Sequence, residues 1–168
     1  TEDGLNRFDG VNFKNYKAEE LSHGYVHSLY EDRQGTLWIG TLTGLLTYSR
    51  ETDTFCRVPI IVKGDTLEAH ISDIIEDSHG NIWAASTGRG LLLCQNNIAR
   101  DCHEYIGVNE IEFLSSVTIE VETNSKGIAH DNLWIVAYKN GVYRINLKTK
   151  EVSLVPIADN RPLAENAY

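Results

Sequence analysis

The 168-residue sequence is long enough for one domain, and its 42% hydrophobic and 23% charged residues are an ordinary globular mixture, which excludes a disordered chain. The 15 Lys and Arg against 24 Asp and Glu give a formal net charge of −9, which excludes nucleic acid and anionic lipid surfaces as expected partners. No apolar run reaches the length of a membrane span, and the N-terminus lacks a signal-peptide pattern. Met is absent even at position 1, so we expect a processed product or an excised piece of a longer protein.

Two segments of the chain are near copies of each other. They read "EDRQGTLWIGTLTGLL" from Glu31 and "EDSHGNIWAASTGRGLL" from Glu76, and their tryptophans, Trp38 and Trp83, lie 45 residues apart. A third, weaker copy is centred on Trp134. Inside each copy, short runs rich in Val, Ile, Leu, Tyr and Trp alternate with turns of Gly, Asn, Asp, Ser and Thr. Four antiparallel strands in a unit of this length are typical of a β-propeller blade.

The predicted units follow one another in chain order, with strands called a, b, c and d in each complete unit. The opening "TEDGLNRFDG" is similar to "TLTGLLTYSR" of the first copy, so residues 1–20 are expected to form strands c and d of an incomplete blade. Complete blades are expected at 21–63, 64–108 and 109–158, and residues 159–168 begin a truncated one. The predicted fold is therefore all-β, a partial β-propeller of three four-stranded antiparallel blades plus an N-terminal half-blade.

The second unit also bears on the cysteines. Its strands are expected near Ile71–Glu76, Asn81–Ala85, Gly90–Cys94 and His103–Ile106, which leaves the polar "QNNIARD" as the c–d turn. Cys94 and Cys102 flank this turn, and either a disulfide across the hairpin or two separate half-buried thiols would fit. With three cysteines at least one stays unpaired, and the absence of C-x-x-C gives no support to structural zinc.

These residues resemble a known family. "HSLYEDRQGTLWIGTLTGLLTYSRETDTF", "SDIIEDSHGNIWAASTGRGLL" and the opening "DGLNRFDGVNFKNY" are similar to the two-component regulator propeller repeat. The resemblance implies the extracytoplasmic, periplasmic sensor region of a hybrid two-component histidine kinase of the Bacteroidetes type, a region that responds to carbohydrate breakdown products. Nothing in the chain resembles a phosphoacceptor histidine box or an ATP-binding lobe, so the resemblance implies a sensor fragment without kinase activity of its own.

The recurring acidic pairs are the first candidates for catalysis, because glycosidases use paired carboxylates. Glu31–Asp32 and Glu76–Asp77 are adjacent in sequence, so on a strand their side chains point to opposite faces and cannot flank one bond. We expect Asp32 and Asp77 to accept backbone N–H groups of the a–b turn instead. The three tryptophans are expected to fill the space between neighbouring blades as core residues.

A glycan-active hydrolase of propeller fold is the main alternative. Sialidases carry an Asp-box, S-x-D-x-G-x-x-W, at similar turns, but this chain has one more residue between Asp and Gly, and no cluster of three arginines is evident. A protein-interaction scaffold is a further alternative. His23 and His27 lie four apart, a metal-binding spacing only on a helix, so no metal site is expected. No P-loop, dinucleotide fingerprint or nucleophile elbow is present, and no cofactor is expected.

The longer and more variable segments are the d–a connections, "KAEELSHGY", "VKGDTLEAH" and "VNEIEFLSS". In a blade the d–a and b–c loops emerge on one side and the a–b and c–d turns on the other. Recognition on a fixed scaffold usually sits on variable loops. The candidate ligand-binding residues are polar or aromatic groups predicted at the d–a and b–c loops: His23, Tyr25, His70, Arg89, Tyr138 and Lys139.

A partial propeller leaves its end sheets without neighbours. We therefore expect self-association through open blade edges, or contact with the remaining propeller blades of the same receptor. The expected function is a non-catalytic, ligand-sensing propeller region of a transmembrane two-component receptor, with an oligosaccharide as its ligand.

Overall fold

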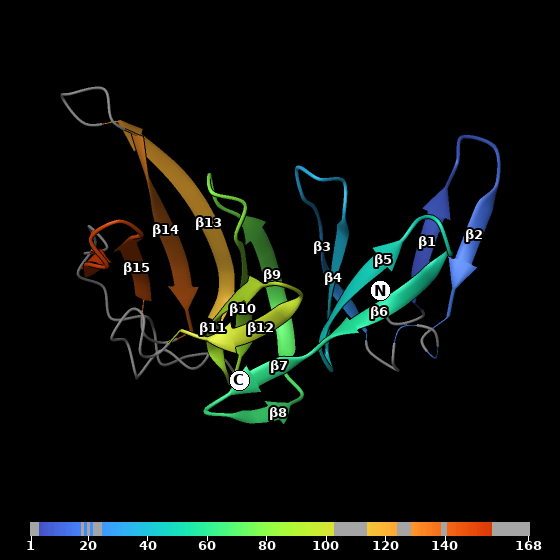
Figure 1. Cartoon of the computed structure of the whole chain (residues 1–168), viewed down its shortest axis with the longest axis horizontal. Coiled ribbons are helices and arrows are strands. Elements are labelled where there is room, and N and C mark those ends of the chain that lie inside the picture. Colours follow the sequence, from blue (N-terminus) through green and yellow to red (C-terminus); the bar gives the residue numbers. More distant parts are fainter. Residues whose placement is uncertain are drawn as a thin grey trace, which may run out of the picture.

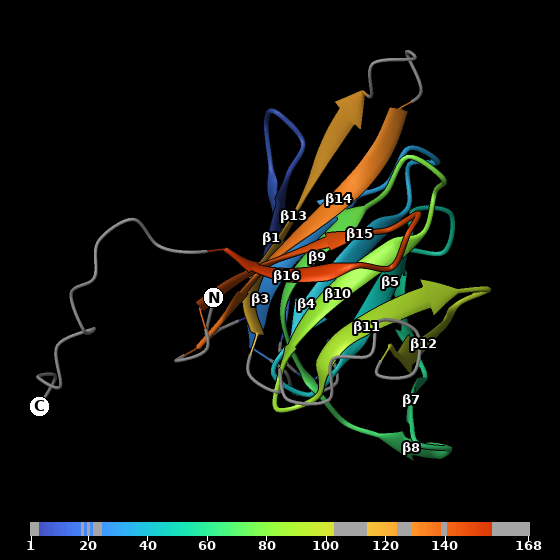
Figure 2. The same cartoon turned by 90° about the vertical axis from the view of Figure 1, so that its left-hand side faces the viewer.

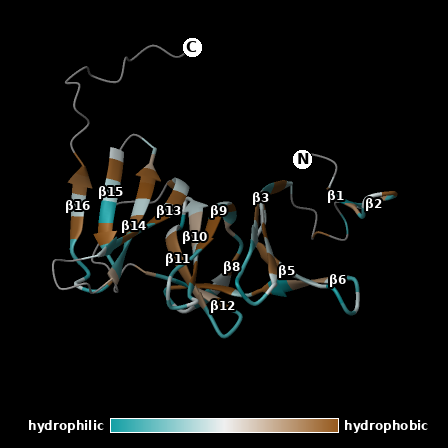
Figure 3. Ribbon diagram, turned by 90° about the horizontal axis from the view of Figure 1, so that it is seen from above, coloured by the Kyte–Doolittle hydropathy of each residue, from teal (hydrophilic) through white to brown (hydrophobic). Residues whose placement is uncertain are grey.

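The computed structural model describes residues 4–17, 19, 21, 25–102, 114–123, 129–138 and 141–155. Every regular element in these ranges is a β-strand, and none of them holds a helix that could cross a membrane. The strands form four separate sheets that follow one another in chain order (Figures 1 and 3). The sheets are open and do not close into a ring. The predicted all-β architecture of three blades and an N-terminal half-blade is confirmed.

Neighbouring strands of each sheet are antiparallel, except where an additional hairpin joins the edge of the second blade in parallel. The half-blade consists of β1 (Leu5–Phe8) and β2 (Phe13–Tyr16); the first blade of β3 (Val26–Glu31), β4 (Leu37–Thr41), β5 (Leu45–Ser49) and β6 (Thr54–Val58); the additional hairpin of β7 (Ile60–Val62) and β8 (Asp65–Leu67); the second blade of β9 (His70–Glu76), β10 (Ile82–Thr87), β11 (Gly90–Gln95) and β12 (Ile98–Asp101); and the third blade of β13 (Leu114–Thr123), β14 (Ala129–Ala137), β15 (Gly141–Asn146) and β16 (Val152–Val155).

The fourth strand of the second blade differs from the prediction. Strand d is β12, which pairs with β11 through Cys94 opposite Ala99, whereas the predicted segment His103–Ile106 lies outside the described residues. The chain reverses within two residues, because Asn96 and Asn97 both take positive φ, 52° and 58°. Asparagine tolerates this conformation and favours two-residue hairpin turns. The prediction read the whole polar segment as turn and so placed the strand too late.

The segment "VKGDTLEAH", expected to be a loop, instead forms much of the β7–β8 hairpin. Its turn is made by Lys63 and Gly64, both with positive φ, and the predicted limit between residues 63 and 64 falls inside it. β7 pairs in parallel with β12, so this hairpin extends the second blade to six strands. The connection between the first and second blades is therefore structured (Figure 2).

The hydrophobic core lies between the sheets, in three clusters. Side chains alternate along each strand, so neighbouring residues such as Leu91 and Leu92 belong to the clusters on opposite faces of the second blade. The first strands lie side by side, because β9 contacts both β3 and β13. We call the face of each sheet toward the preceding sheet its inner face, and the face toward the following sheet its outer face.

Of the three tryptophans predicted to be core residues, two are buried in the described structure and one is half-buried. Trp38 and Trp83 are 5% and 2% exposed and lie between consecutive blades. Trp134 is only half-buried, on the outer face of the third blade, where no described sheet follows. Its indole donates to Glu120 at 2.9 Å, in the absence of a turn aspartate. Because the described residues end with the third blade, the expectation that Trp134 fills a space between blades stays a prediction.

The cysteines do not form a disulfide. Cys94 packs in the core between the first and second blades, whereas Cys102 packs in the core between the second and third. The two thiols therefore lie on opposite sides of one sheet. Burial raises the pKa of Cys94 to about 12 and also raises that of Cys102, so both stay protonated at neutral pH.

Candidate functional site: a groove between the second and third blades

The aspartate of each acidic pair closes its own a–b turn. Asp32 Oδ1 accepts the N–H groups of Gln34 and Thr36 at 3.0 and 2.7 Å, and its Oδ2 accepts the indole N–H of Trp38 at 2.8 Å. Asp77 repeats this arrangement around Trp83, with an indole distance of 2.9 Å. The predicted turn role of both aspartates is confirmed.

The glutamate of the second pair has a role that sequence reasoning missed. Glu76 Oε2 accepts the backbone N–H of Arg33, in the a–b turn of the first blade, at 2.9 Å and pairs with its guanidinium at 3.3 Å. In the third blade Asp131 does the same for the second, accepting the N–H of Ser78 at 2.7 Å. Each of these two acids therefore holds the turn of the blade before it.

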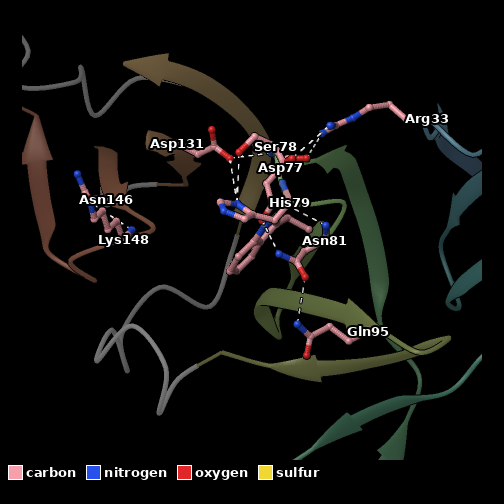
Figure 4. A network of polar contacts seen from close by, with 10 residues as sticks. Arg33, Asp77, Ser78, His79, Asn81, Gln95, Asp131, Asn146 and Lys148 are labelled. Atoms are coloured by element: carbon pink, nitrogen blue, oxygen red, sulfur yellow. Dashed lines mark hydrogen bonds and ion pairs between the residues drawn. The ribbon is translucent and has the colours of Figure 1, made fainter. Parts of the chain in front are cut away.

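A groove of about 590 Å³ opens beside the a–b turn of the second blade, where that turn faces the third blade (Figure 4). Its volume falls in the range of small-molecule sites. Residues of both blades line it: Asp77, His79, Asn81, Trp83, Leu93, Gln95, Ala129, His130, Asp131, Leu147 and Lys148.

Hydrogen bonds orient the polar groups of the groove. The amide nitrogen of Asn81 donates to Asp77 at 2.8 Å, and the amide nitrogen of Gln95 donates to the Asn81 oxygen at 3.1 Å. Lys148 lies in the c–d turn of the third blade, where Asn146 Oδ1 accepts its backbone N–H at 3.0 Å. The side chain of His79 is 77% exposed at the rim. The groove thus presents amide, imidazole and ammonium groups beside apolar carbons.

Asp77, His79 and Asp131 lie close enough together to be considered as a metal site. Asp77 does not fit this role, because its carboxylate already accepts four hydrogen bonds, from the backbone of His79 and Asn81, the Asn81 amide and the Trp83 indole. These donors use the acceptor positions that a cation would need. Asp131 Oδ2 is likewise occupied by Ser78, although Oδ1 is buried without a hydrogen-bond partner among the described residues.

A comparable groove of about 460 Å³ lies between the first and second blades. It is lined by Trp38, Gly80, Asn81, Ile82, Cys94, Gln95, Asn96 and Asn97, none of which is charged. Grooves of this kind therefore recur with the blade repeat, and of these two only the groove between the second and third blades has charged and imidazole groups among its described lining residues.

Four of the predicted ligand residues lie at the opposite edge of the sheets. Tyr25 precedes β3, His70 begins β9, Arg89 lies in the β10–β11 turn and Tyr138 follows β14. His23 and Lys139 lie outside the described residues. Tyr25, Arg89 and Tyr138 are exposed.

Among these residues, His70 makes a contact between blades. Its ring lies 4.3 Å from that of His27 in the first blade, centroid to centroid. Burial, and secondarily the neighbouring imidazole, lower the pKa of His70, so it titrates as a weaker base than an ordinary histidine.

Sequence reasoning missed the groove because it treated the a–b turns as scaffold. One signal was present: the second copy has His79 where the first has Gln34. A second signal was the longer a–b connection of the third copy, "TNSKGIAHDN". In the structure β13 and β14 are correspondingly long, ten and nine residues, and extend past the turn of the second blade (Figure 1).

The comparison with protein families identifies the repeat. Residues 20–43, which include the turn closed by Asp32 and Trp38, match the two component regulator propeller family. Over these residues the chain is similar to the two-component regulator propeller repeat. The matched segment is the first blade from its a strand to the end of its b strand, where the resemblance in the sequence is also strong.

Relatives extend this likeness over more of the propeller chain. A protein named histidine kinase P4, from Formosa agariphila, is 45% identical over 78 residues, which are 44% of this chain and 6% of the relative. The extracellular domain of the putative hybrid two component system BT4673 from B. thetaiotaomicron aligns over 92% of this chain with a TM-score of 0.68 at 24% identity. That of BT3049, from the same organism, aligns over 95% with a TM-score of 0.65 at 21% identity.

The two structural likenesses show the propeller fold. This chain spans 22% and 23% of the length of those two domains, and 6% of the curated relative.

Proposed function

We propose that this chain is part of the ligand-sensing propeller of a membrane-spanning two-component receptor, that it lies in the periplasm, and that it responds to an oligosaccharide without acting on it. The propeller repeat, together with relatives named as a histidine kinase and as extracellular domains of two-component systems, supports the receptor role. The observation that carries ligand binding is the groove between the second and third blades.

The chemistry of the groove suits a hydroxylated ligand. Asn81 and Gln95 offer amide groups that both donate and accept, and Lys148 offers a donor for a hydroxyl oxygen. Leu93 and Leu147 line the same groove and offer apolar contact for the C–H groups of a sugar ring. Glycan-binding sites need this mixture, because a sugar presents hydroxyls at its edge and carbon at its faces.

We propose that the chain is not catalytic because its recurring acids are already held by structural hydrogen bonds. Asp32 and Asp77 are held by turn and indole N–H groups, and Glu76 is held by Arg33 of the neighbouring blade. Carboxylates fixed in this way by their own scaffold are poorly placed to act as an acid and a base on either side of a glycosidic bond.

Calorimetric titration of the protein with a panel of oligosaccharides tests the proposal, with chromatography of the mixture to detect products. Saturable heat without product is the expected result. Product release would replace sensing with hydrolysis, and no heat across the panel would remove the oligosaccharide from the proposal.

Two variants locate the site. His79→Ala should weaken the measured affinity about tenfold, the loss of one hydrogen bond to the ligand. Gln34→Ala is the matched control, since Gln34 holds the same turn position in the first blade, and it should leave affinity unchanged. If His70→Ala and Arg89→Ala weaken binding while His79→Ala does not, the ligand binds at the opposite edge of the sheets.

A further inference from the structure

The c–d turns of the first and third blades can be compared residue by residue. Their flanking cross-strand pairs, Tyr48 with Phe55 and Ile145 with Val152, are equally far apart in the sequence. Each of these turns meets the outer face of the preceding sheet. The junction of the half-blade with the first blade therefore shows what such a turn contacts, and the junction of the second and third blades, which contains the groove, shows what differs.

A carboxylate closes the first of these junctions. Asp53, in the c–d turn of the first blade, accepts hydrogen bonds from the Tyr16 and Tyr48 hydroxyls at 2.6 and 2.5 Å. It also pairs with Lys14 and lies 3.7 Å from Arg7, two cations opposite each other on the outer face of the half-blade. Lys14 and then the two hydroxyls hold the pKa of Asp53 well below its ordinary value, so this carboxylate is charged at neutral pH.

The c–d turn of the third blade has the opposite charge. Lys150 stands where the first blade has Asp53, and both residues take positive φ, 64° and 55°. Lys148, which lines the groove, stands where the first blade has Glu51. Two acids at the first junction are thus replaced by two lysines beside the groove.

The facing surface of the second blade keeps one cation. Leu93 and Arg100 are opposite each other on its outer face, at the positions of Arg7 and Lys14. Leu93 lines the groove, and Arg100 is exposed next to it on the neighbouring strand. At this junction a basic turn therefore meets a sheet that also carries a cation, and the position of Asp53 supplies no carboxylate.

The two aspartates of the groove lie at its other end and are already bound. Asp77 and Asp131 lie beside the a–b turns, where they accept the Trp83 indole and the Ser78 backbone N–H, and each is only 2% exposed. In the part of the chain that the structure describes, no carboxylate forms an ion pair with the Lys148 ammonium. The c–d end of the groove is therefore the end suited to a negatively charged group.

We propose that the groove binds an acidic oligosaccharide, with a carboxylate or sulfate of the sugar held by Lys148 and with Arg100 at the edge of the contact. This inference rests on the proposed function and specifies the class of sugar. The anion of the ligand takes the role that Asp53 has in the first junction, while Asn81 and Gln95 bind the sugar hydroxyls. Because the whole chain has a net charge of −9, the anion is recognised by this short-range contact and is not attracted from a distance.

Paired ligands that differ only in charge test this inference. Each uronic acid oligosaccharide of a panel is titrated beside its methyl ester, and each sulfated oligosaccharide beside its desulfated form, with neutral oligosaccharides included. Calorimetric titration should give at least tenfold tighter binding for the charged member of one kind of pair. The pair that shows this difference identifies the anion as a carboxylate or a sulfate.

Variants of one lysine locate the charge. Lys148→Gln should weaken binding of the charged ligand tenfold or more, because it removes a charge-assisted hydrogen bond, and should leave binding of the uncharged counterpart unchanged. Lys148→Glu, which introduces the acid that the first blade has at this position, should abolish binding of the charged ligand. Lys63→Gln is the control, because it removes the same charge from the turn of the β7–β8 hairpin, and it should bind like the unaltered protein. Circular dichroism confirms that each variant is folded.

The outcomes separate this inference from the proposed function. Equal affinity for charged and uncharged partners, or binding of neutral sugars alone, overturns the acidic ligand and leaves oligosaccharide sensing in place. Unchanged binding of the charged ligand to Lys148→Gln places the anion elsewhere and also overturns the inference, as does an equal loss for both members of a pair. No heat with any sugar overturns the oligosaccharide of the proposed function, and this inference with it.

Discussion

Trp83 and Trp134 occupy the same position of the same strand in consecutive blades, but their surroundings differ. Trp83 is 2% exposed, bonded to Asp77 and packed against the third blade. Trp134 is half-buried and bonded to Glu120, on a face that no described sheet covers. The repeat determines the strand and the direction of the side chain, whereas the neighbouring blade determines whether that side chain is core.

The largest expected effect is at the covered tryptophan. Trp83→Ala should lower the free energy of unfolding by about 3–5 kcal/mol, because it removes a large side chain from a packed core. Trp134→Ala, the matched variant, should cost about 1 kcal/mol or less, because that side chain already meets solvent. Urea denaturation measures both. Equal losses would show that the third blade is covered in solution.

The turn aspartate should be the next most sensitive position. Asp77→Ala leaves two turn N–H groups and the Trp83 indole without their acceptor, at a cost of about 2–3 kcal/mol. Thr123→Ala, at the position where the third unit lacks this aspartate, should change stability by less than about 0.5 kcal/mol. Thermal unfolding compares the two, and a loss at Asp77 as small as that at Thr123 would contradict the turn role.

The packing between blades can also be tested at the position two residues after each tryptophan. Gly40, Ala85 and Val136 hold equivalent positions, and a Cβ at Gly40 would lie 2.8 Å from Ile71 Cγ2 and 3.0 Å from its carbonyl oxygen. Gly40→Ala should therefore cost about 1–3 kcal/mol by overpacking. Val136→Ala, on the uncovered face, should cost under about 1 kcal/mol. A neutral Gly40→Ala would mean that the first two blades can move apart without penalty.

The smallest effect concerns thiol reactivity. Cys56 is exposed, whereas Cys94 and Cys102 are buried and have raised pKa values. In the native protein an aromatic disulfide reagent at pH 8 should modify Cys56 rapidly and the other two only after unfolding. Rapid modification of all three at once would show that the cores between the blades open readily.

Much of this fold could be predicted from the sequence, because its signals are local. The period between Trp38 and Trp83, the Gly-containing turns and the turn aspartates are each readable within a few residues, and the blades follow from them. The prediction placed strand β12 too late. Two asparagines are enough for this turn, whereas the polar composition of the whole segment suggested a longer one. The β7–β8 hairpin was missed because its pairing partner, β12, lies about forty residues further along.

The candidate groove was less accessible to sequence reasoning, because it exists only where two blades meet. His79 and Lys148 are separated by most of two units and are brought together by the stacking of sheets. The link from Glu76 to Arg33 has the same origin, because alternation along the strand directs Glu76 toward the first blade, whereas Asp77 holds the turn and the tryptophan of its own blade. Four of the predicted ligand residues do lie along one edge of the sheets, and their role stays a prediction.

The acids that cross between blades bear on how such an array grows. A unit like the second blade has an acid that holds the turn of the preceding blade, and a turn that is held by an acid of the following blade. Duplication of such a unit therefore supplies a matching contact at each end. The third unit uses Asp131 on its b strand where the second uses Glu76 on its a strand. A following unit can thus differ in sequence and in hairpin length while it remains joined to its predecessor, and in the third blade residues of the lengthened hairpin line the groove.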